Sequence, residues 1–294
     1  MSSPDCITWM TIGLVESVAI VTLNLCTIIV FIRNCNLRKR STYLVINLAV
    51  IDTLAGGVAV YALFYWFGVI CEVWRGHLNV GLQGYIVENL LVFFPGMSIF
   101  NISLIALERA YATFRPLRHR LLKKWVYGLL IACGWVGPGL PIITLELLKT
   151  TGARNRYPKI AGILFCLLTI CVSYSSIAIK VRCGGQPQHH GAASRERKLT
   201  MTLLIVNIAS LLLCLPVVVF YILLDDGPFE LSVSASSHLY GAVQALLYAN
   251  PLVNPIIYAI RIPGYRSAVA ALFCKKPALR NGNRRVVDLP LRDL

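Results

Sequence analysis

The sequence predicts an all-α membrane protein: a seven-transmembrane helix bundle with a short amphipathic eighth helix and its N-terminus outside the membrane. Hydrophobic residues make up 57% of the 294 residues and charged residues only 14%, a composition that argues against an ordinary soluble domain. A hydrocarbon core of roughly 30 Å requires on the order of 20 apolar residues per helix. Because lipid offers the backbone no hydrogen-bond partner, such runs must be helices. They fill the chain at about 11–33, 43–69, 80–112, 125–148, 157–181, 196–224 and 236–260.

The basic residues set the orientation of the first and every later run. The formal net charge is +15, and most lysines and arginines lie in alternate segments, near 33–40, 115–124 and 180–198 and after residue 260. This bias is typical of cytoplasmic loops, so we expect the N-terminus outside and the C-terminus inside. The charge is therefore a topology signal and gives no reason to expect nucleic-acid binding.

We expect one membrane domain and no second soluble domain. Residues 1–10 form a short outer segment, 11–262 the bundle, 263–276 the amphipathic helix and 277–294 a basic cytoplasmic tail. Residues 1–10 lack the basic start of a cleavable signal peptide, so the first helix is expected to act as the insertion signal. Cys6 and Cys71 fall near the outer face and could form a disulfide there.

The second run carries a carboxylate two to three turns into the membrane, at Asp52. A polar group at this depth is costly and usually faces the bundle interior. Two compatible interpretations remain open: a knot of hydrogen bonds between helices, or oxygen ligands for a small hard cation or a water cluster. The expected companions lie in the first, third and seventh runs: Asn24, Ser98, Asn250 and Asn254.

The third run ends in a fixed cation, Arg109, beside Glu108. Glu196, at the start of the sixth run, could pair with Arg109 and form a breakable latch between the two helices. Alternatively, Glu196 is only part of a solvated run of charges.

Prolines mark the sixth and seventh runs, and an amphipathic segment follows them. Pro216 and Pro255 are expected to bend their helices at mid-depth. The segment 263–276 reads as a helix on the inner leaflet, with Cys274 next to two lysines as a palmitoylation candidate. Its predicted apolar side consists of Tyr265, Val269, Leu272 and Phe273.

From about residue 14 to 276 the chain resembles the rhodopsin-like (class A) G protein-coupled receptors. Each motif is weak alone, but their order and spacing together are specific to that family. The matching features are Asn24, Leu48–Asp52, Glu108-Arg109-Ala110, Phe114–Leu117, Trp135, Tyr174, Pro216 and Asn254-Pro255-Ile256-Ile257-Tyr258.

The resemblance implies a receptor of the plasma membrane that takes an extracellular ligand among the outer helix halves. The inner end of helix six would swing outward, and a heterotrimeric G protein would enter beside Arg109. Arrestin, a receptor kinase and membrane lipid are the other implied partners, and no cofactor is expected beyond a possible allosteric sodium ion. Asp52, Ser98, Asn250 and Asn254 resemble the sodium site, with Asn24 in the same polar network. Arg109, Tyr174 and Tyr258 resemble the active-state network, and Arg109 with Glu196 the inactive-state latch.

Several departures from the family pattern are similar to the melanocortin, cannabinoid and lysophospholipid receptor group. Gly84 stands where most members have a disulfide cysteine, and Cys166 replaces the usual helix-five proline. Cys214 occupies the toggle-tryptophan position. Leu91 replaces the aspartate of amine receptors, so a cationic amine ligand is not expected.

The expected ligand pocket is mostly apolar, which favours a lipid-like or small peptide ligand. The alternative for each residue is packing alone. The residues are Glu88, Leu91, Val92, Cys214, Phe220 and Tyr240.

Other seven-helix functions fit less well. A retinal protein needs a Schiff-base lysine in the last helix, and there is none between Ser236 and Ile260. A transporter or channel predicts repeated halves or a polar ring, and an enzyme predicts a catalytic or metal set, none of which we find. A receptor-like protein that signals without ligand or acts as a dimer partner stays open, because the toggle tryptophan is missing.

Overall fold

The computed structural model describes most of the chain, and the regular structure in that part is helical. It covers residues 3–34, 37, 42–70, 80–140, 144, 153–183, 205, 208–220, 233–261 and 263–273. At some helix ends only the backbone is described, including Cys6 in the first helix and Glu88 in the third.

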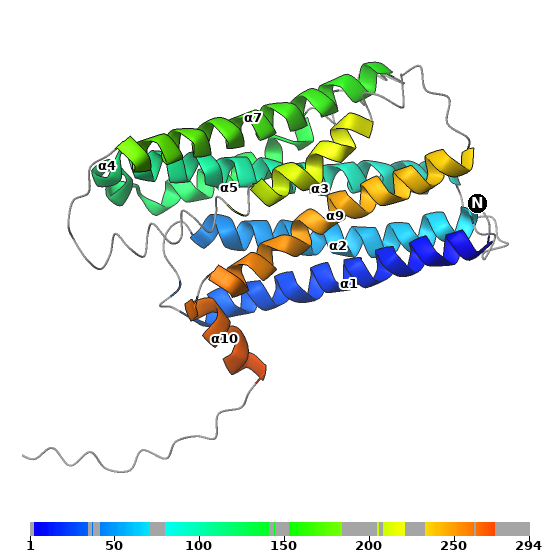
Figure 1. The fold of residues 1–294 in the computed structure, drawn as a ribbon, viewed down its shortest axis with the longest axis horizontal. Helices are drawn as coiled ribbons and strands as arrows, with labels where there is room; N and C mark the ends of the chain where they lie inside the picture. Colours follow the sequence, from blue (N-terminus) through cyan, green and yellow to red (C-terminus); the bar gives the residue numbers. More distant parts are fainter. Residues whose placement is uncertain are drawn as a thin grey trace, which may run out of the picture.

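Each of the seven predicted runs contains a helix of one elongated bundle (Figure 1). Five helices are long and apolar enough to cross a membrane, by length and composition. Two shorter apolar helices, α5 and Ile208–Phe220, occupy the fourth and sixth runs. The helix bounds are α1 Ser3–Arg33, α2 Thr42–Ile70, α3 Val80–Phe114, α4 Pro116–Leu121, α5 Lys124–Val136, α7 Ala153–Cys183, α9 Val233–Arg261 and α10 Pro263–Phe273.

Two boundaries differ from the sequence prediction. The first helix begins at Ser3 instead of residue 11, so most of the expected outer segment is helical. The fourth run was expected to be one helix over 125–148, but α5 ends at Val136 and a turn follows at 137–138. Pro138 explains the break, because proline has no N–H to donate and its ring clashes with the carbonyl four residues earlier.

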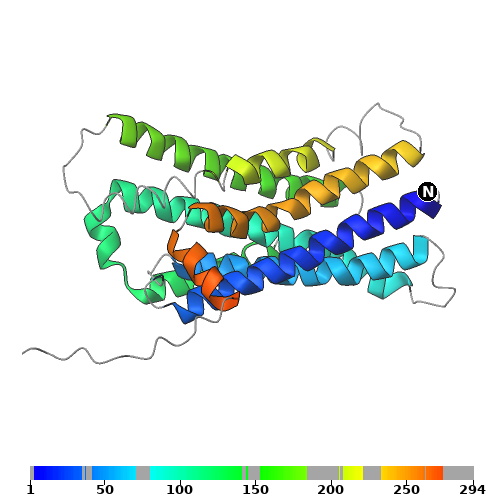
Figure 2. The ribbon, with the colours of Figure 1, turned by 60° about the horizontal axis from the view of Figure 1, so that its bottom comes forward.

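α1, α2 and α3 pack against one another in chain order, and α9 returns to pack against α1. α1 packs against α2, α9 and α10, while α3 packs against α2, α4, α5 and α7. The N-terminus lies at one end of the bundle, and both α4 and α10 lie at the opposite end (Figures 1 and 2). By the distribution of basic residues, this opposite end is the expected cytoplasmic one.

The main apolar core lies toward the end that carries α4 and α10. We call this set of buried side chains the inner cluster. It is formed by Val30, Phe31, Leu44, Leu48, Ile102, Ile105, Ala106, Tyr127, Ile170, Tyr174, Ile177, Ile257, Tyr258, Tyr265 and Ala268. Because these residues come from α1, α2, α3, α5, α7, α9 and α10, the inner cluster holds the inner halves of these helices together.

α1 and α2 approach closely at Gly56. A Cβ atom built at Gly56 would lie 2.9 Å from a side-chain carbon of Ile20 and 2.9 Å from one of Val21. The next residue, Gly57, has nothing within 4 Å of such a Cβ atom. The absence of a side chain at Gly56 is therefore what allows the two helices to touch.

We predict that Gly56→Val lowers the free energy of unfolding by about 1–3 kcal/mol, because the added methyl groups overpack the α1–α2 contact. Gly57→Val is the matched control, since it places the same β-branched side chain into open space one residue later. Thermal unfolding of the purified protein in detergent measures the difference. Equal losses of Tm in both variants would show that the helices do not touch at Gly56.

Candidate functional site

Asp52 lies at the centre of the polar site and joins three helices. Its side chain is fully buried in α2. The Ser98 hydroxyl of α3 donates to Oδ1 at 2.6 Å, and the Asn254 side-chain amide of α9 donates to Oδ2 at 2.9 Å. Both carboxylate oxygens therefore have a donor from another helix, as the sequence predicted for Ser98 and Asn254.

Asn24 belongs to the same polar region but has a different partner from the one expected. Its side-chain amide donates to the backbone carbonyls of Ile20 at 3.0 Å and of Pro251 at 3.1 Å. Pro251 lies four residues before Pro255, which has no N–H to give to that carbonyl. Asn24 thus supplies the donor that the proline removes, and this bond ties α1 to α9.

A stripe of oxygen atoms on α9 has no hydrogen-bond partner among the described residues. The stripe consists of Asn250 Oδ1, Asn254 Oδ1 and the Tyr258 hydroxyl, all buried. Residues four apart share one face of a helix, and the bond from Asn254 to Asp52 shows that this face looks into the bundle. A buried acceptor without a donor costs roughly 1–3 kcal/mol. The stripe is therefore suited to water molecules or to a cation.

A second polar node, which the sequence analysis did not predict, lies between α2, α3 and α5. The Asn47 side-chain amide donates to Asn101 Oδ1 at 3.1 Å, and the Trp135 indole N–H donates to Asn47 Oδ1 at 3.0 Å. Asn101 in turn donates to the carbonyl of Leu44 at 3.1 Å. The available signal was the presence of two amide side chains, Asn47 and Asn101, at membrane depth.

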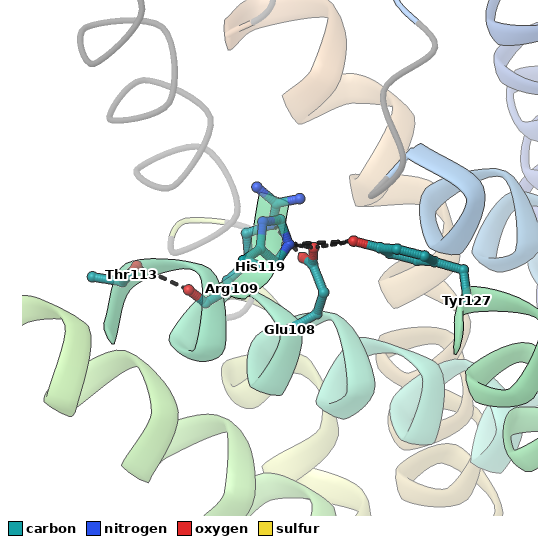
Figure 3. Close-up of polar contacts among 5 residues, drawn as sticks. All are labelled: Glu108, Arg109, Thr113, His119 and Tyr127. Atoms are coloured by element: carbon teal, nitrogen blue, oxygen red, sulfur yellow. Dashed lines mark hydrogen bonds and ion pairs between the residues drawn. The ribbon is translucent and has the colours of Figure 1, made fainter. Parts of the chain in front are cut away.

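Glu108 and Arg109 lie at the inner end of α3 within a compact charged group (Figure 3). Arg109 Nε is 2.8 Å from Glu108 Oε2, an ion pair whose angles are not those of a hydrogen bond. His119 Nε2 of α4 is 2.6 Å from Glu108 Oε1, and the Tyr127 hydroxyl of α5 donates to the same oxygen at 3.1 Å. Glu108 therefore links α3 to both α4 and α5.

His119 and Tyr127 are residues of the candidate site that sequence reasoning missed. A single histidine in a basic loop gives little indication of its partner. Only the fold shows that His119 of α4 contacts Glu108 of α3. The predicted partner Glu196 lies outside the described residues, so the latch stays a prediction. Within the described residues, the acidic neighbour of Arg109 is Glu108.

Tyr174 and Tyr258, predicted to act with Arg109, are both buried in the inner cluster. Tyr258 also meets Tyr265 of α10 edge to face, with ring centroids 6.2 Å apart. The Tyr265 hydroxyl lies 2.7 Å from Thr27 Oγ1, and because the Thr27 hydroxyl donates to Leu23, Tyr265 must be the donor. The predicted apolar side of the amphipathic helix thus packs partly on α1 and α9.

At the opposite end, the expected ligand pocket is only partly brought together. The rings of Phe220 and Tyr240 lie 6.0 Å apart, which joins helix Ile208–Phe220 to α9. Leu91 and Val92 are half-buried on α3. Cys214 is 1% exposed and packs with Ile99, Cys166 and Leu167, so it belongs to a small core between α3, α7 and helix Ile208–Phe220.

A polar contact near the start of α1 was also not predicted. The Trp9 indole N–H donates to His238 Nδ1 at 3.1 Å, and the other ring nitrogen of His238 lies 3.6 Å from Asp5 Oδ2. A Cβ atom at Gly241 would lie 2.8 Å from the Trp9 ring. These contacts join α1 and α9 at their outer ends.

Other predicted features also fall outside the described residues. Cys71 and Cys274 are not described, so neither the disulfide with Cys6 nor palmitoylation is tested. The side chains of Cys6 and Glu88 are likewise outside the description, although the backbone of both is helical.

Comparison with known proteins agrees with this geometry. Residues 155–258 match the family described as 7 transmembrane receptor (rhodopsin family). Opsin-VA of Rutilus rutilus is 23% identical over 307 residues, which cover 93% of this chain and 76% of the opsin. The histamine H2 receptor of Homo sapiens is 26% identical over 292 residues, covering 85% of this chain and 75% of that receptor. The crystal structure of squid rhodopsin gives a TM-score of 0.75 at 17% identity, covering 93% of this chain and 86% of that one.

These similarities support the predicted family, the rhodopsin-like (class A) G protein-coupled receptors. The predicted all-α seven-transmembrane fold is thereby confirmed, and the receptor is a membrane protein and not an enzyme. The tachykinin-like peptides receptor 99D of Drosophila melanogaster is also similar, at 22% identity over 273 residues. That alignment covers 80% of this receptor and about half, 51%, of the fly protein. Membership of the melanocortin, cannabinoid and lysophospholipid group stays a prediction.

We predict that Asn24→Leu destabilises the receptor by about 1–3 kcal/mol, because the Pro251 carbonyl is left buried without a donor. Thr22→Val is the matched control: Thr22 is exposed and its hydroxyl bonds only within α1, to the Val18 carbonyl. Thermal unfolding of both variants in the same detergent tests the difference. If Asn24→Leu melts at the same temperature as Thr22→Val, the α1–α9 bond contributes nothing.

Proposed function

We propose that this receptor binds a lipid-like or small peptide ligand from outside the plasma membrane and activates a heterotrimeric G protein. The observation that carries the proposal is the position of Arg109, a fixed cation at the inner end of a membrane-spanning helix. Its charge is partly balanced by Glu108, which is itself held by His119 and Tyr127. Arrestin and a receptor kinase are expected partners of the same cytoplasmic face.

Activation would free Arg109 to contact the G protein. Arg109 is 7% exposed, and the turn of α3 before it, with Ile105 and Ala106, belongs to the inner cluster that contains the buried Tyr174 and Tyr258. An outward swing of the inner end of the sixth helix would uncover this group. Pro216 lies within Ile208–Phe220, where it removes one backbone hydrogen bond and makes a bend less costly.

An apolar ligand fits the outer half of the bundle. Leu91 and Val92 present aliphatic surface on α3. The Phe220–Tyr240 pair presents aromatic surface near the outer ends of helix Ile208–Phe220 and α9. Such a lining gains most of its binding energy from apolar area and rejects a strongly charged ligand.

The residues around Asp52 fit a sodium ion as an allosteric modulator. A small hard cation prefers oxygen ligands, and the site offers the Asp52 carboxylate and the Ser98 hydroxyl. The unpaired Oδ1 atoms of Asn250 and Asn254 are further acceptors in the same region. The bound ion would neutralise the carboxylate and complete the coordination of these atoms. Loss of the ion would favour rearrangement of α2, α3 and α9.

Our first functional prediction is that Arg109→Ala lowers G protein activation roughly tenfold or more, since losing a buried charged contact costs about 2 kcal/mol or more. Heterotrimer dissociation in cells, measured for a panel of G protein classes with and without a lipid and peptide library, is the readout. Arg266→Ala, an exposed arginine on α10, is the control and should signal normally. Recording basal dissociation separates ligand-driven from ligand-independent signalling. Unchanged signalling by Arg109→Ala at equal surface expression would refute the assigned role.

A second prediction concerns the ion. Sodium should stabilise the wild-type receptor against heat by on the order of 1–2 kcal/mol relative to potassium at equal ionic strength. Asp52→Asn should abolish the difference, because the charge that attracts the ion is gone. Thr53→Val, whose native hydroxyl bonds only to the Ala49 carbonyl of its own helix, should retain it. No sodium–potassium difference in the wild type would show that the network is structural only.

A further inference from the structure

We propose that Trp9, His238 and Asp5 form a proton-binding site at the outer end of the bundle. We call these three residues the outer junction. A proton from the outer solution binds Nδ1 of His238, breaks the bond to Trp9 and loosens α1 from α9. Proton binding does not depend on the ligand or the G protein, whereas its effect on signalling rests on the proposed function.

The outer junction joins two helices from opposite ends of the sequence. α1 and α9 pack against each other, and the start of α9 lies beside the N-terminal end of α1 (Figures 1 and 2). The Trp9 indole N–H donates to His238 Nδ1 at 3.1 Å, and the two rings have their centroids 6.3 Å apart. The other ring nitrogen, Nε2, is 3.6 Å from Asp5 Oδ2. Both nitrogens of the imidazole therefore face groups of α1.

Trp9 decides which protonation state of His238 fits this arrangement. An indole N–H can only donate, so the nitrogen that it faces must offer a lone pair. A neutral imidazole carries one proton, which must then lie on Nε2, toward Asp5. A second proton can bind only at Nδ1, where its N–H would meet the N–H of Trp9. Protonation of His238 and the bond from Trp9 therefore exclude each other.

The charged ring keeps one partner after the Trp9 bond is lost. The carboxylate of Asp5 remains opposite Nε2 and becomes the counter-charge of the imidazolium. Among the described side chains of the helices packed against α9, Asp5 is the charged group that meets His238. The other described charged side chains on those helices lie deeper in the bundle or at its inner end: Glu16, Arg33, Asp52, Glu108, Arg109 and Arg266.

The outer junction is open to the solution that would supply the proton. The side chains of His238 and Asp5 are 42% and 34% exposed. Histidine is the side chain that ordinarily changes charge between about pH 5 and pH 8. Moderate acidification outside the membrane is therefore sufficient for the proposed step.

α9 connects the outer junction to the helix that the proposed activation moves. The Trp9 ring packs closely on α9, since a Cβ atom at Gly241 would lie 2.8 Å from it. The neighbouring residue, Tyr240, faces the ring of Phe220 at 6.0 Å. The outer end of α9 is thus joined to α1 on one side and to helix Ile208–Phe220 on the other. A change in the first contact alters the support of the second.

The burial of Arg109 gives the direction of the effect. Arg109 is 7% exposed, so the outer junction is formed here together with a closed inner end. The bond from Trp9 to His238 stabilises this arrangement, and a proton that breaks it favours departure from it. Acid should therefore raise signalling.

The first test follows the Trp9 indole N–H of the full-length receptor by nitrogen-edited proton NMR between about pH 8 and about pH 5. Trp9→Phe assigns this signal among those of the five tryptophans. We expect the resonance to move upfield in acid as its hydrogen bond is lost. His238→Gln keeps a polar side chain that does not titrate, and should remove the movement.

His119→Gln is the matched control for the NMR test. It removes the other histidine that the structure describes, at the inner end of the bundle, and should leave the movement of the Trp9 signal intact. A Trp9 signal that does not move in the wild type would overturn the proposal and leave the outer junction a structural contact. An equal movement in His238→Gln would also overturn it.

The second test measures heterotrimer dissociation in cells at an outer pH of about 7.5 and about 5.5. We expect acid to raise basal dissociation about two- to tenfold, the change in an equilibrium that one hydrogen bond of this kind gives. Trp9→Phe keeps an aromatic ring over Gly241 without the N–H, and should signal at the raised level at both pH values. Thr11→Val is the control: its native hydroxyl bonds to the Ile7 carbonyl of the same helix, and its acid response should be that of the wild type.

The two tests separate this proposal from the proposed function. A fall in dissociation in acid, or a rise that Trp9→Phe retains, would overturn the coupling assigned to the outer junction. Absence of dissociation for every G protein at either pH would instead refute the proposed function. The NMR titration would still decide whether His238 takes up the proton at the expense of Trp9.

Discussion

A carboxylate buried among apolar helices requires partners from other helices, and Asp52 is that constraint in this receptor. Asp52 is shielded from bulk water, so its two oxygens depend on partners inside the bundle, among them Ser98 and Asn254. Removing either donor would leave part of a buried charge uncompensated. The register of α2 against α3 and α9 is therefore fixed by hydrogen bonds, whereas apolar packing alone would tolerate several registers.

Polar contacts at three depths join α1 to α9 and α10. Trp9 meets His238 near the outer end, Asn24 meets the Pro251 carbonyl at mid-depth, and Thr27 meets Tyr265 of α10. α7 and helix Ile208–Phe220 meet α3 through an apolar cluster that includes Ile99, Cys166 and Cys214. Apolar contacts slide at lower cost than directed hydrogen bonds, which suits the half of the bundle that the proposed activation moves. The charged group of Glu108, Arg109, His119 and Tyr127 lies at the inner end of α3, which borders both halves.

The partners of Asp52 could be predicted because few polar groups lie at membrane depth and each must find another. The same reasoning predicted Asn24 as a partner of Asp52. In the structure the Asn24 amide donates instead to the Pro251 carbonyl, which Pro255 leaves without a backbone donor. The node of Asn47, Asn101 and Trp135 and the bond of His119 to Glu108 escaped prediction. Each depends on how helices cross and on where a loop folds back, and one-dimensional spacing does not record either.

The sequence by itself determined the class, the number of spanning helices and the residues that had to be buried together, and it predicted the orientation of the helices. These follow from the thickness of the bilayer, the positive charge of cytoplasmic loops and the cost of polar groups in lipid. Only the tertiary structure decided which donor meets which acceptor, and that α4 turns His119 inward and Leu117 and Leu121 outward. Hydrogen bonds are short and directional, so their partners are chosen by atomic positions that no composition or periodicity specifies.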